Sequence, residues 1–317
     1  MAASNQNNEP TEKRPHVNDS IEQIDDSSWL IGGRMLLSRQ QSLSSEQPSW
    51  SDGKGAFFVI SDAPTPRPSP RSVAGTEGEI PRVYDADDLS AVWRAGEAFI
   101  KVQNIAFPQA TREHVTLQFL EEKGKLDFEY PRALHHAEFD GRYYLIVSRV
   151  SGRTLQDAWP SMNEPTRQHY VSLVAQICDT MATWKGNLIA GVDGRHLPER
   201  RWTSDCDVPY NFEPPYLVEL LKSMGMDTSA SPVFYHTDLG PGNILVEPEK
   251  RSIAIIDWET AGYVTREWVR TKFLLSSGMD FATEDWSPDP SWRFADAARL
   301  GEMGYADACE GWRAVFK

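Results

Sequence analysis

The sequence predicts an α+β protein of two lobes, in which a small antiparallel β-sheet lobe with one helix precedes a larger, mainly helical lobe. Two hairpin patterns on either side of one amphipathic helix predict the small lobe over residues 81–150. After Ser151-Gly152 the apolar residues recur at helical rather than strand spacing, which predicts the larger lobe over residues 151–317.

Residues 1–80 differ in composition from the rest of the chain. They are rich in Ser, Asn, Gln and Pro, and the segment PTPRPSPRS (64–72) should be extended and solvated. Two apolar patches, SSWLIGGRMLL and AFFVI, could form a short helix and a strand. We expect a low-complexity N-terminal tail that is mostly disordered.

Two β-hairpins are expected in the small lobe. The first joins strands at about 91–94 and 98–102 through a short turn that contains glycine. The second joins strands at 133–139 and 142–147 through Asp140-Gly141, a strong two-residue turn signal. Together these patterns predict an antiparallel sheet.

One helix is expected between the hairpins, at about residues 109–122. Within it Glu113, Leu117 and Leu120 fall at positions i, i+4 and i+7. The acidic side chain therefore shares the inward face of the helix with two leucines.

The larger lobe is expected to be mainly helical. Thr154 can cap a short helix, and Pro165 opens a longer one whose apolar stripe continues to a stop at Gly186. We interpret this stripe as a buried core face rather than a ligand-facing surface. Further helical segments are expected around 265–275 and from residue 294 to residue 317.

Composition restricts the classes of partner. The formal net charge of −14 argues against a nucleic acid or an anionic membrane and is compatible with a cationic substrate. Cys178, Cys206 and Cys309 lie far apart without a C-x-x-C pair, so neither a disulfide framework nor a zinc site is expected. No apolar run approaches the ~18 residues of a membrane span, and the polar N-terminus lacks the apolar core of a secretory signal. We therefore expect a cytoplasmic protein, and its oligomeric state is not specified.

The segment Tyr235–Asp257 carries the strongest chemical signal. It contains H-x-D-x-x-x-x-N, then two short apolar runs around a polar turn, and an aspartate at the end of the second run. Asp238 can accept a proton or a hydrogen bond from an attacking group, while Asn243 and Asp257 can supply hard oxygen ligands to Mg²⁺. Alternatively, Asp238 caps a turn, Asn243 ends that turn and Asp257 ends a strand. The conjunction of all three favours a phosphotransferase site.

The run HTDLGPGNILV resembles the catalytic loop of the aminoglycoside phosphotransferase and choline kinase-like family, which has a protein-kinase-like fold. The run IIDWETAGY resembles the metal-binding segment of that family, and TREWVRTKF is similar to versions common in its fungal members. The resemblance covers roughly residues 81–317. It implies transfer of the γ-phosphate of ATP, with Mg²⁺, to a hydroxyl of a small molecule. It also implies that His236 braces the loop rather than acting as the base.

The resemblance implies nucleotide contacts in and after the small lobe. It makes Lys101 the residue that contacts the α- and β-phosphates, and Glu113 the carboxylate that positions it. Backbone groups of Ser148 and Val150 would pair with adenine. From the strand pattern alone, Lys101 could equally be a solvated edge residue.

The expected phosphate-covering loop departs from the kinase pattern. Kinases place glycines there so that backbone amides can approach the phosphates. Here the segment Asp85–Ser90 contains no glycine and three acids, whose carboxylates would repel a triphosphate, although the Ser90 hydroxyl could donate. This departure motivates an alternative interpretation, a pseudokinase that binds nucleotide without turnover.

A divergent protein kinase is a less favoured alternative. Gly240 stands where protein kinases carry a lysine, two residues after the catalytic aspartate. Asp257-Trp258-Glu259 stands in place of D-F-G, and no A-P-E segment follows. A small hydroxyl-bearing acceptor is therefore a better expectation than a peptide.

Acceptor recognition is expected from residues that follow the metal aspartate. The candidates are Glu259, Glu267 and Trp268, with Trp258, Trp286 and Trp292 as further aromatic residues. Carboxylates and aromatic faces together would suit a cationic amine. The tryptophans could instead pack the core of the helical lobe, and the identity of the acceptor cannot be deduced from this pattern.

Overall fold

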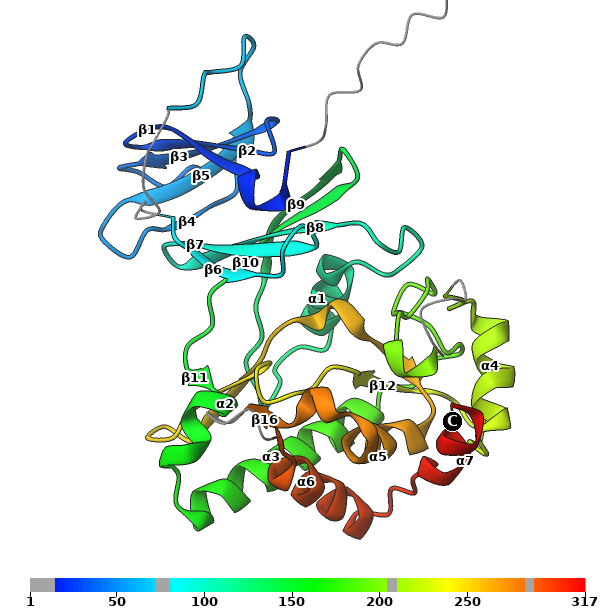
Figure 1. Ribbon diagram of the computed structural model, residues 1–317. Coiled ribbons are helices and arrows are strands. Elements are labelled where there is room, and N and C mark those ends of the chain that lie inside the picture. The colour runs from blue at the N-terminus through cyan, green and yellow to red at the C-terminus, as the bar shows by residue number, and fades with distance from the viewer. Residues whose placement is uncertain (1–14, 72–79, 204–209, 283–287, 317) are drawn as a thin grey trace, which may run out of the picture. The chain divides into compact units, whose positions relative to one another are not determined.

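The computed structural model describes residues 15–71, 80–203, 210–282 and 288–316 (Figure 1). The chain divides into two compact units, which we describe separately. The first comprises Met1–Ile105 and Leu134–Ser148, and the second comprises Ala106–Ala133 and Arg149–Lys317. Antiparallel sheets dominate the first unit and helices the second, which confirms the predicted α+β class.

The first unit begins with a five-stranded antiparallel sheet of strand order β1-β2-β3-β5-β4. Its strands are β1 (Ile21–Asp25), β2 (Ser28–Ile31), β3 (Met35–Gln40), β4 (Ser49–Ser51) and β5 (Phe57–Asp62). The structure contradicts the expected disordered tail over this region. The strands are only three to six residues long, and polar connections between them dominate the local composition.

The second sheet of the first unit has the strand order β6-β7-β8-β10-β9. Its strands are β6 (Arg82–Asp85), β7 (Ser90–Ala95), β8 (Ala98–Asn104), β9 (Ala133–Phe139) and β10 (Arg142–Ser148). Both predicted hairpins are present. Asp140 and Gly141 have φ values of 52° and 72°, the left-handed geometry that a tight two-residue hairpin turn requires.

Side chains from both sheets of the first unit form one hydrophobic core cluster among the described residues. The first sheet contributes Trp29, Ile31, Met35, Leu37, Trp50, Phe58 and Ile60, and the second contributes Ala91, Trp93, Ile100, Val102, Tyr144 and Ile146. Trp50 Nε1 also donates to the Ala95 carbonyl at 2.8 Å. A Cβ on Gly96, at φ +60°, would lie 2.6 Å from Asp52 Cα, so glycine is needed where the β7–β8 turn meets the first sheet.

The helices of the second unit match most of the predicted helical segments. They are α1 (Glu113–Glu122), α2 (Leu155–Ala158), α3 (Glu164–Ala182), α4 (Pro214–Ser223), α5 (Arg266–Leu275), α6 (Ser291–Glu302) and α7 (Cys309–Val315). The one helix expected in the small lobe, α1, belongs to the second unit and begins four residues later than expected. The helix expected over residues 294–317 is two helices, and Gly304 between them has φ +84°. No helix among the described residues is long and apolar enough to cross a membrane.

Short antiparallel strands in the second unit support the motif-bearing loops. β11 (Arg153–Thr154) pairs with β13 (Ile244–Glu247), which pairs with β14 (Ser252–Ile255). β12 (Val233–His236) pairs with β15 (Ala261–Val264), and β16 (Phe281–Ala282) pairs with β17 (Pro288–Asp289). The hairpin predicted between the two parts of the metal motif is β13–β14.

Candidate active site

The loop from Thr237 to Asn243 joins β12 to β13 and is closed by its own backbone. The Gly240 amide donates to the Asp238 carbonyl at 2.8 Å, and the Asn243 amide donates to the Gly240 carbonyl at 2.9 Å. The Pro241 carbonyl accepts from the Gln156 amide at 3.1 Å, which ties the loop to α2. These contacts fix the backbone on which the predicted catalytic side chains stand.

His236 is fully buried and contacts the backbone of this loop. Its Nδ1 accepts from the Asp238 amide at 3.2 Å, and its Nε2 lies 3.0 Å from the Ile256 carbonyl. Because Nδ1 accepts, Nε2 carries the hydrogen and donates, which is the arrangement of a neutral imidazole. Burial lowers the pKa of His236 below its ordinary value, consistent with a neutral ring.

Asp238 and Asn243 lie together at the surface of the loop. The Asn243 Nδ2 group donates to both the backbone carbonyl of Asp238, at 2.8 Å, and its Oδ2, at 3.1 Å. The Asp238 side chain is exposed, so a molecule from solvent can reach its carboxylate. With both Nδ2 bonds directed at Asp238, Oδ1 is the atom of Asn243 that is suited to a cation.

Asp257 follows β14 at the same end of the hairpin as Asn243. The Ile256 amide donates to the Asn243 carbonyl at 2.9 Å, which places the residue before Asp257 beside Asn243. Asp257 itself has φ 65° and ψ 55°, a left-handed conformation that aspartate adopts more readily than most residues. A break from the strand at this residue redirects its side chain away from the strand pleat.

The donor set of Asn243 and Asp257 fits a magnesium ion. Mg²⁺ is commonly held by one or two side-chain oxygens, with waters and substrate phosphates completing its coordination. No cluster of three His, Cys, Asp or Glu that could hold a metal occurs in the part of the chain that the structure describes.

Glu113 and Thr237 connect this loop region to the segment after Asp257. Glu113 is 2% exposed, and its Oε1 accepts from the Trp258 amide at 3.2 Å. Thr237 Oγ1 donates to the Thr260 carbonyl at 2.7 Å. Glu113 was predicted to make a different contact and Thr237 was not predicted, because a backbone partner leaves no pattern in side-chain identities.

Trp258 contacts His236 at the start of the motif and Ile255 near its end. Its ring stacks between Phe128 and Phe234, with centroid distances of 6.0 and 6.2 Å, and meets His236 edge-on at 4.8 Å. It is fully buried, and its Nε1 donates to the Ile255 carbonyl at 2.9 Å. Trp258 is therefore a core residue rather than part of an aromatic cage.

Lys101 lies at the centre of the second sheet, on β8 between Val92 of β7 and Leu145 of β10. Its neighbours Ile100 and Val102 point into the core shared with the first sheet, so Lys101 points to the opposite face. A solvated edge position is excluded, because β8 is an internal strand. Lys101 belongs to the first unit and Glu113 to the second, so the contact between them stays a prediction.

The remaining predicted nucleotide residues lie at the ends of strands. Ser148 ends β10 opposite Ala98, and Val150 follows at the start of the second unit. Ser90 begins β7 and is half-buried. Their nucleotide contacts stay predictions.

The turn from Asp85 to Ser90 is closed by internal hydrogen bonds. The Ala86 amide donates to the Ser90 carbonyl at 2.9 Å, and the Leu89 amide donates to the Ala86 carbonyl at 3.2 Å. The Asp87 amide donates to Asp85 Oδ1 at 2.8 Å, and Asp87 has φ 56°. Three amides that a glycine-rich loop would offer to phosphates are thus used within this turn.

The structure contradicts a ligand-facing role for Trp268. Trp268 is fully buried, packs on Trp202 at 5.2 Å, and its Nε1 donates to Glu199 at 3.4 Å. Glu199 in turn forms a buried ion pair with Lys272, whose Nζ lies 2.7 Å from both carboxylate oxygens. The indole is held by these core contacts, so its faces are not available to a substrate.

The other acceptor candidates divide into buried and half-buried residues. Trp292 is 1% exposed and belongs to the core, as Trp258 does. Glu259 and Glu267 are half-buried, so their roles stay predictions. Trp286 lies outside the described residues.

One protein-family model matches the chain. The model of the phosphotransferase enzyme family matches residues 78–267, more than half of the chain. That span contains Lys101, Glu113 and the whole loop and hairpin from His236 to Asp257. A comparison with curated proteins gives no match.

Several solved structures of aminoglycoside phosphotransferases are similar to the chain at low identity. The gentamicin complex of APH(2")-IIa has a TM-score of 0.48 and 14% identity, and the match covers 73% of this chain and 80% of that one. Aminoglycoside-3'-phosphotransferase of type VIII has a TM-score of 0.48, 15% identity and coverages of 77% and 94%. APH(3'')-Id from Streptomyces rimosus has a TM-score of 0.43, 17% identity and coverages of 74% and 90%. On the match over residues 78–267, the chain belongs to the phosphotransferase enzyme family.

Proposed function

We propose that the protein transfers the γ-phosphate of ATP, with Mg²⁺, to a hydroxyl group of a small molecule. The observation that carries this proposal is the arrangement of Asp238, Asn243 and Asp257 on one braced loop and hairpin. Membership of the phosphotransferase enzyme family supports the reaction class.

Asp238 is the proposed base. Its carboxylate is exposed to an incoming hydroxyl and is held on a loop whose backbone is fixed by His236 and by Asn243. In the proposed reaction it orients the acceptor hydroxyl toward the γ-phosphate and accepts its proton. The neutral, buried His236 contributes position rather than proton transfer.

Asn243 and Asp257 would hold the metal through their side-chain oxygens. When bound there, Mg²⁺ would neutralise part of the negative charge that shifts toward the leaving phosphate. Glu113 supports Asp257 through the next amide, that of Trp258. Because phosphoryl transfer relies mainly on positioning and electrostatics, a rigid backbone at this point favours the reaction.

The nucleotide contacts in the proposal rest on the sequence resemblance. Lys101 would bind the α- and β-phosphates, with Glu113 positioning it. Backbone groups of Ser148 and Val150 would bind adenine, and the Ser90 hydroxyl would face the phosphates. The internal strand position of Lys101 supports its part, since its side chain lies on the sheet face opposite the hydrophobic core.

The acceptor is proposed to be a small, cationic molecule that carries a hydroxyl. The formal net charge of −14 favours association with a cation over an anion. Glu259 and Glu267, both half-buried after the metal-binding segment, are the proposed contacts for its charge.

A second candidate function is a protein that binds nucleotide or ligand without turnover. The glycine-free turn favours it, because the amides of Ala86, Asp87 and Leu89 donate within the turn. Nucleotide binding without transfer to any acceptor would support this candidate.

Replacement of Asp238 tests the proposed reaction. We expect Asp238→Asn to lower the turnover number by at least about a hundredfold and to leave ATP affinity within about threefold, because the residue addresses the acceptor. The measurement is phosphate transfer from labelled ATP to a panel of hydroxylated amines, with ATP binding measured by calorimetry. Asp227→Asn, at an exposed turn aspartate, is the matched control. Comparable transfer by Asp238→Asn and the parent would refute the assignment.

A further inference from the structure

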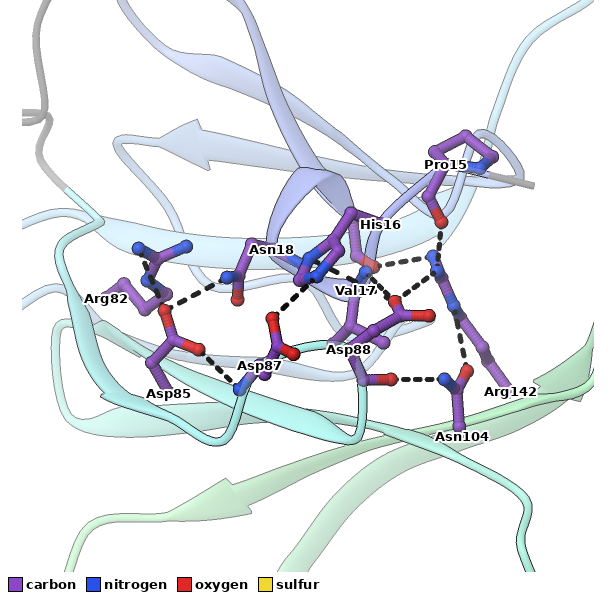
Figure 2. Close-up of polar contacts among 11 residues, drawn as sticks. Pro15, His16, Val17, Asn18, Arg82, Asp85, Asp87, Asp88, Asn104 and Arg142 are labelled. Atoms are coloured by element: carbon purple, nitrogen blue, oxygen red, sulfur yellow. Dashed lines mark hydrogen bonds and ion pairs between the residues drawn. The ribbon is translucent and has the colours of Figure 1, made fainter. Parts of the chain in front are cut away.

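The segment Pro15–Ser20, which we call the clamp segment, precedes the first sheet and lies beside the Asp85–Ser90 turn (Figure 2). It contains the single-turn 3₁₀ helix η1 (Val17–Asp19), which packs against β7 and β8. Val17 is fully buried in the core between the two sheets. The clamp segment is therefore anchored in the first unit by an apolar side chain.

Each carboxylate of the turn contacts a different residue of the clamp segment. The Val17 amide donates to Asp88 Oδ1 at 2.8 Å, His16 Nε2 lies 3.1 Å from Asp87 Oδ1, and Asn18 Nδ2 donates to Asp85 Oδ2 at 3.0 Å. His16 Nδ1 accepts from the Asn18 amide, so its Nε2 carries the hydrogen that Asp87 accepts. Figure 2 shows all three carboxylates directed toward the clamp segment.

Arg142 links the clamp segment to the turn from a buried position on β10. Its Nη1 donates to Ser20 Oγ at 3.0 Å, its Nη2 donates to the Pro15 carbonyl, and Nη2 lies 3.7 Å from Asp88 Oδ1. Asn104, opposite Arg142 on β8, donates from its side chain to the Asp88 carbonyl and from its amide to the Leu89 carbonyl. The buried Arg142 therefore contacts both the turn and the clamp segment, and Asn104 holds the turn.

Cationic side chains lie beside two of the three carboxylates of the turn. Arg82 lies 3.0 Å from Asp85, and Arg142 lies 3.7 Å from Asp88, so two of the three carboxylates have a cationic neighbour. Hydrogen bonds from the clamp segment reach all three. A carboxylate that is paired and directed at its partner repels a nearby phosphate less than one that is free to rotate.

We propose that the clamp segment positions the Asp85–Ser90 turn and holds its three carboxylates in a state that tolerates a bound triphosphate. This role rests on the proposed function, in which the turn covers the nucleotide phosphates. Amides of the turn donate internally, so the turn offers the phosphates little attraction. The position of its carboxylates then determines how the turn affects the affinity for ATP. In this proposal the clamp segment affects nucleotide binding by fixing the position of the turn.

The double variant His16→Ala/Asn18→Ala removes two clamp contacts and keeps Val17 in the core. We expect it to raise the KM for ATP about three- to tenfold and to leave kcat within about twofold, since the contacts are exposed and act on binding. Amide hydrogen exchange of residues 85–90 should speed up in the full chain without nucleotide. Arg71→Ala, which breaks an exposed ion pair with Asp26 in the same unit, is the matched control.

A background without the three carboxylates separates an effect of their charge from an effect on the folding of the turn. In Asp85→Asn/Asp87→Asn/Asp88→Asn chains, the same double replacement should change the KM for ATP by less than about twofold, because no carboxylates remain to be released. An equally large change in that background would overturn the proposal and assign the clamp segment a purely structural effect.

The two proposals fail in different ways. If the parent binds Mg²⁺–ATP but exchange of residues 85–90 and the KM are unchanged in His16→Ala/Asn18→Ala, the clamp proposal is overturned and the proposed function stands. If the parent does not bind Mg²⁺–ATP, the proposed function fails and the nucleotide role of the clamp segment fails with it. In that case faster exchange in the variant would show only a contact that orders the turn.

Discussion

His236 contacts two parts of the candidate site through backbone groups. Both ring nitrogens are used, one by the amide of the proposed base and one by the carbonyl that precedes Asp257. The ring thus connects the two halves of the motif through backbone groups. A charged imidazole would lose the Nδ1 acceptor, so protonation works against this arrangement.

The lowered pKa of His236 predicts a loss of stability in mild acid. The folded state binds this proton less readily than the unfolded state, whose pKa is near 6.5. The contribution of His236 to the free energy of unfolding is therefore constant above that pH and decreases as the pH is lowered further. Because one proton is involved, the slope from this group does not exceed about 1.4 kcal/mol per pH unit.

Urea unfolding between about pH 7.5 and pH 5 measures this slope. His236→Gln should flatten it, because the variant cannot bind the proton. His135→Gln is the matched comparison, since burial also lowers the pKa of His135, on β9 of the other unit. A slope in His236→Gln equal to that of the parent would contradict the neutral, buried ring.

At this scale a sequence predicts candidate side chains but not their backbone partners. Spacing alone selected Asp238, Asn243 and Asp257, because a phosphotransferase needs those chemical groups at those offsets. The bond from the Trp258 amide to Glu113 could not be deduced, since any residue has an amide. Trp268 was misassigned because an aromatic residue near a site has the same pattern whether it faces a ligand or the core.

At the scale of elements, the first sheet, β1–β5, occupies a region for which the sequence predicted a mostly disordered tail. Its core side chains pack directly on those of β7, β8 and β10, so it supports the sheet that carries Lys101. The first sheet was not predicted, because short strands separated by polar segments resemble a low-complexity tail in composition. The long helix α3, with its sustained apolar stripe, was correctly predicted.

Phe58→Ala tests whether the first sheet supports the second. Phe58 is 3% exposed in the shared core and packs against Trp29 and Trp50, so the change should cost about 3–5 kcal/mol. Amide exchange of β8 should speed up together with that of β5, measured by hydrogen exchange. Leu43→Ala, at a residue 62% exposed, is the control and should leave both unchanged. Unaltered exchange in β8 beside a loosened β5 would mean that the two sheets are stable independently.

At the scale of the whole molecule, the sequence predicted the α+β class and the change of character near residue 150. The two units meet in sequence at Ser148 and Arg149, close to that boundary. The assignment of α1 to the second unit could not be predicted, because a helix between two hairpins gives no local sign of the side on which it packs. Residues 106–133 therefore interrupt the first unit in sequence.

The central claim is that Asp257 belongs to a site for metal and nucleotide together. Thermal melting of the full chain with Mg²⁺, with ATP, and with both tests it most directly, beside Asp257→Ala and the surface control Asp227→Ala. We expect stabilisation of about 2–3 kcal/mol near a hundredfold excess over Kd when both ligands are present, and its loss only in Asp257→Ala. An equal shift in Asp257→Ala, or no shift in the parent at millimolar ATP, would contradict the account.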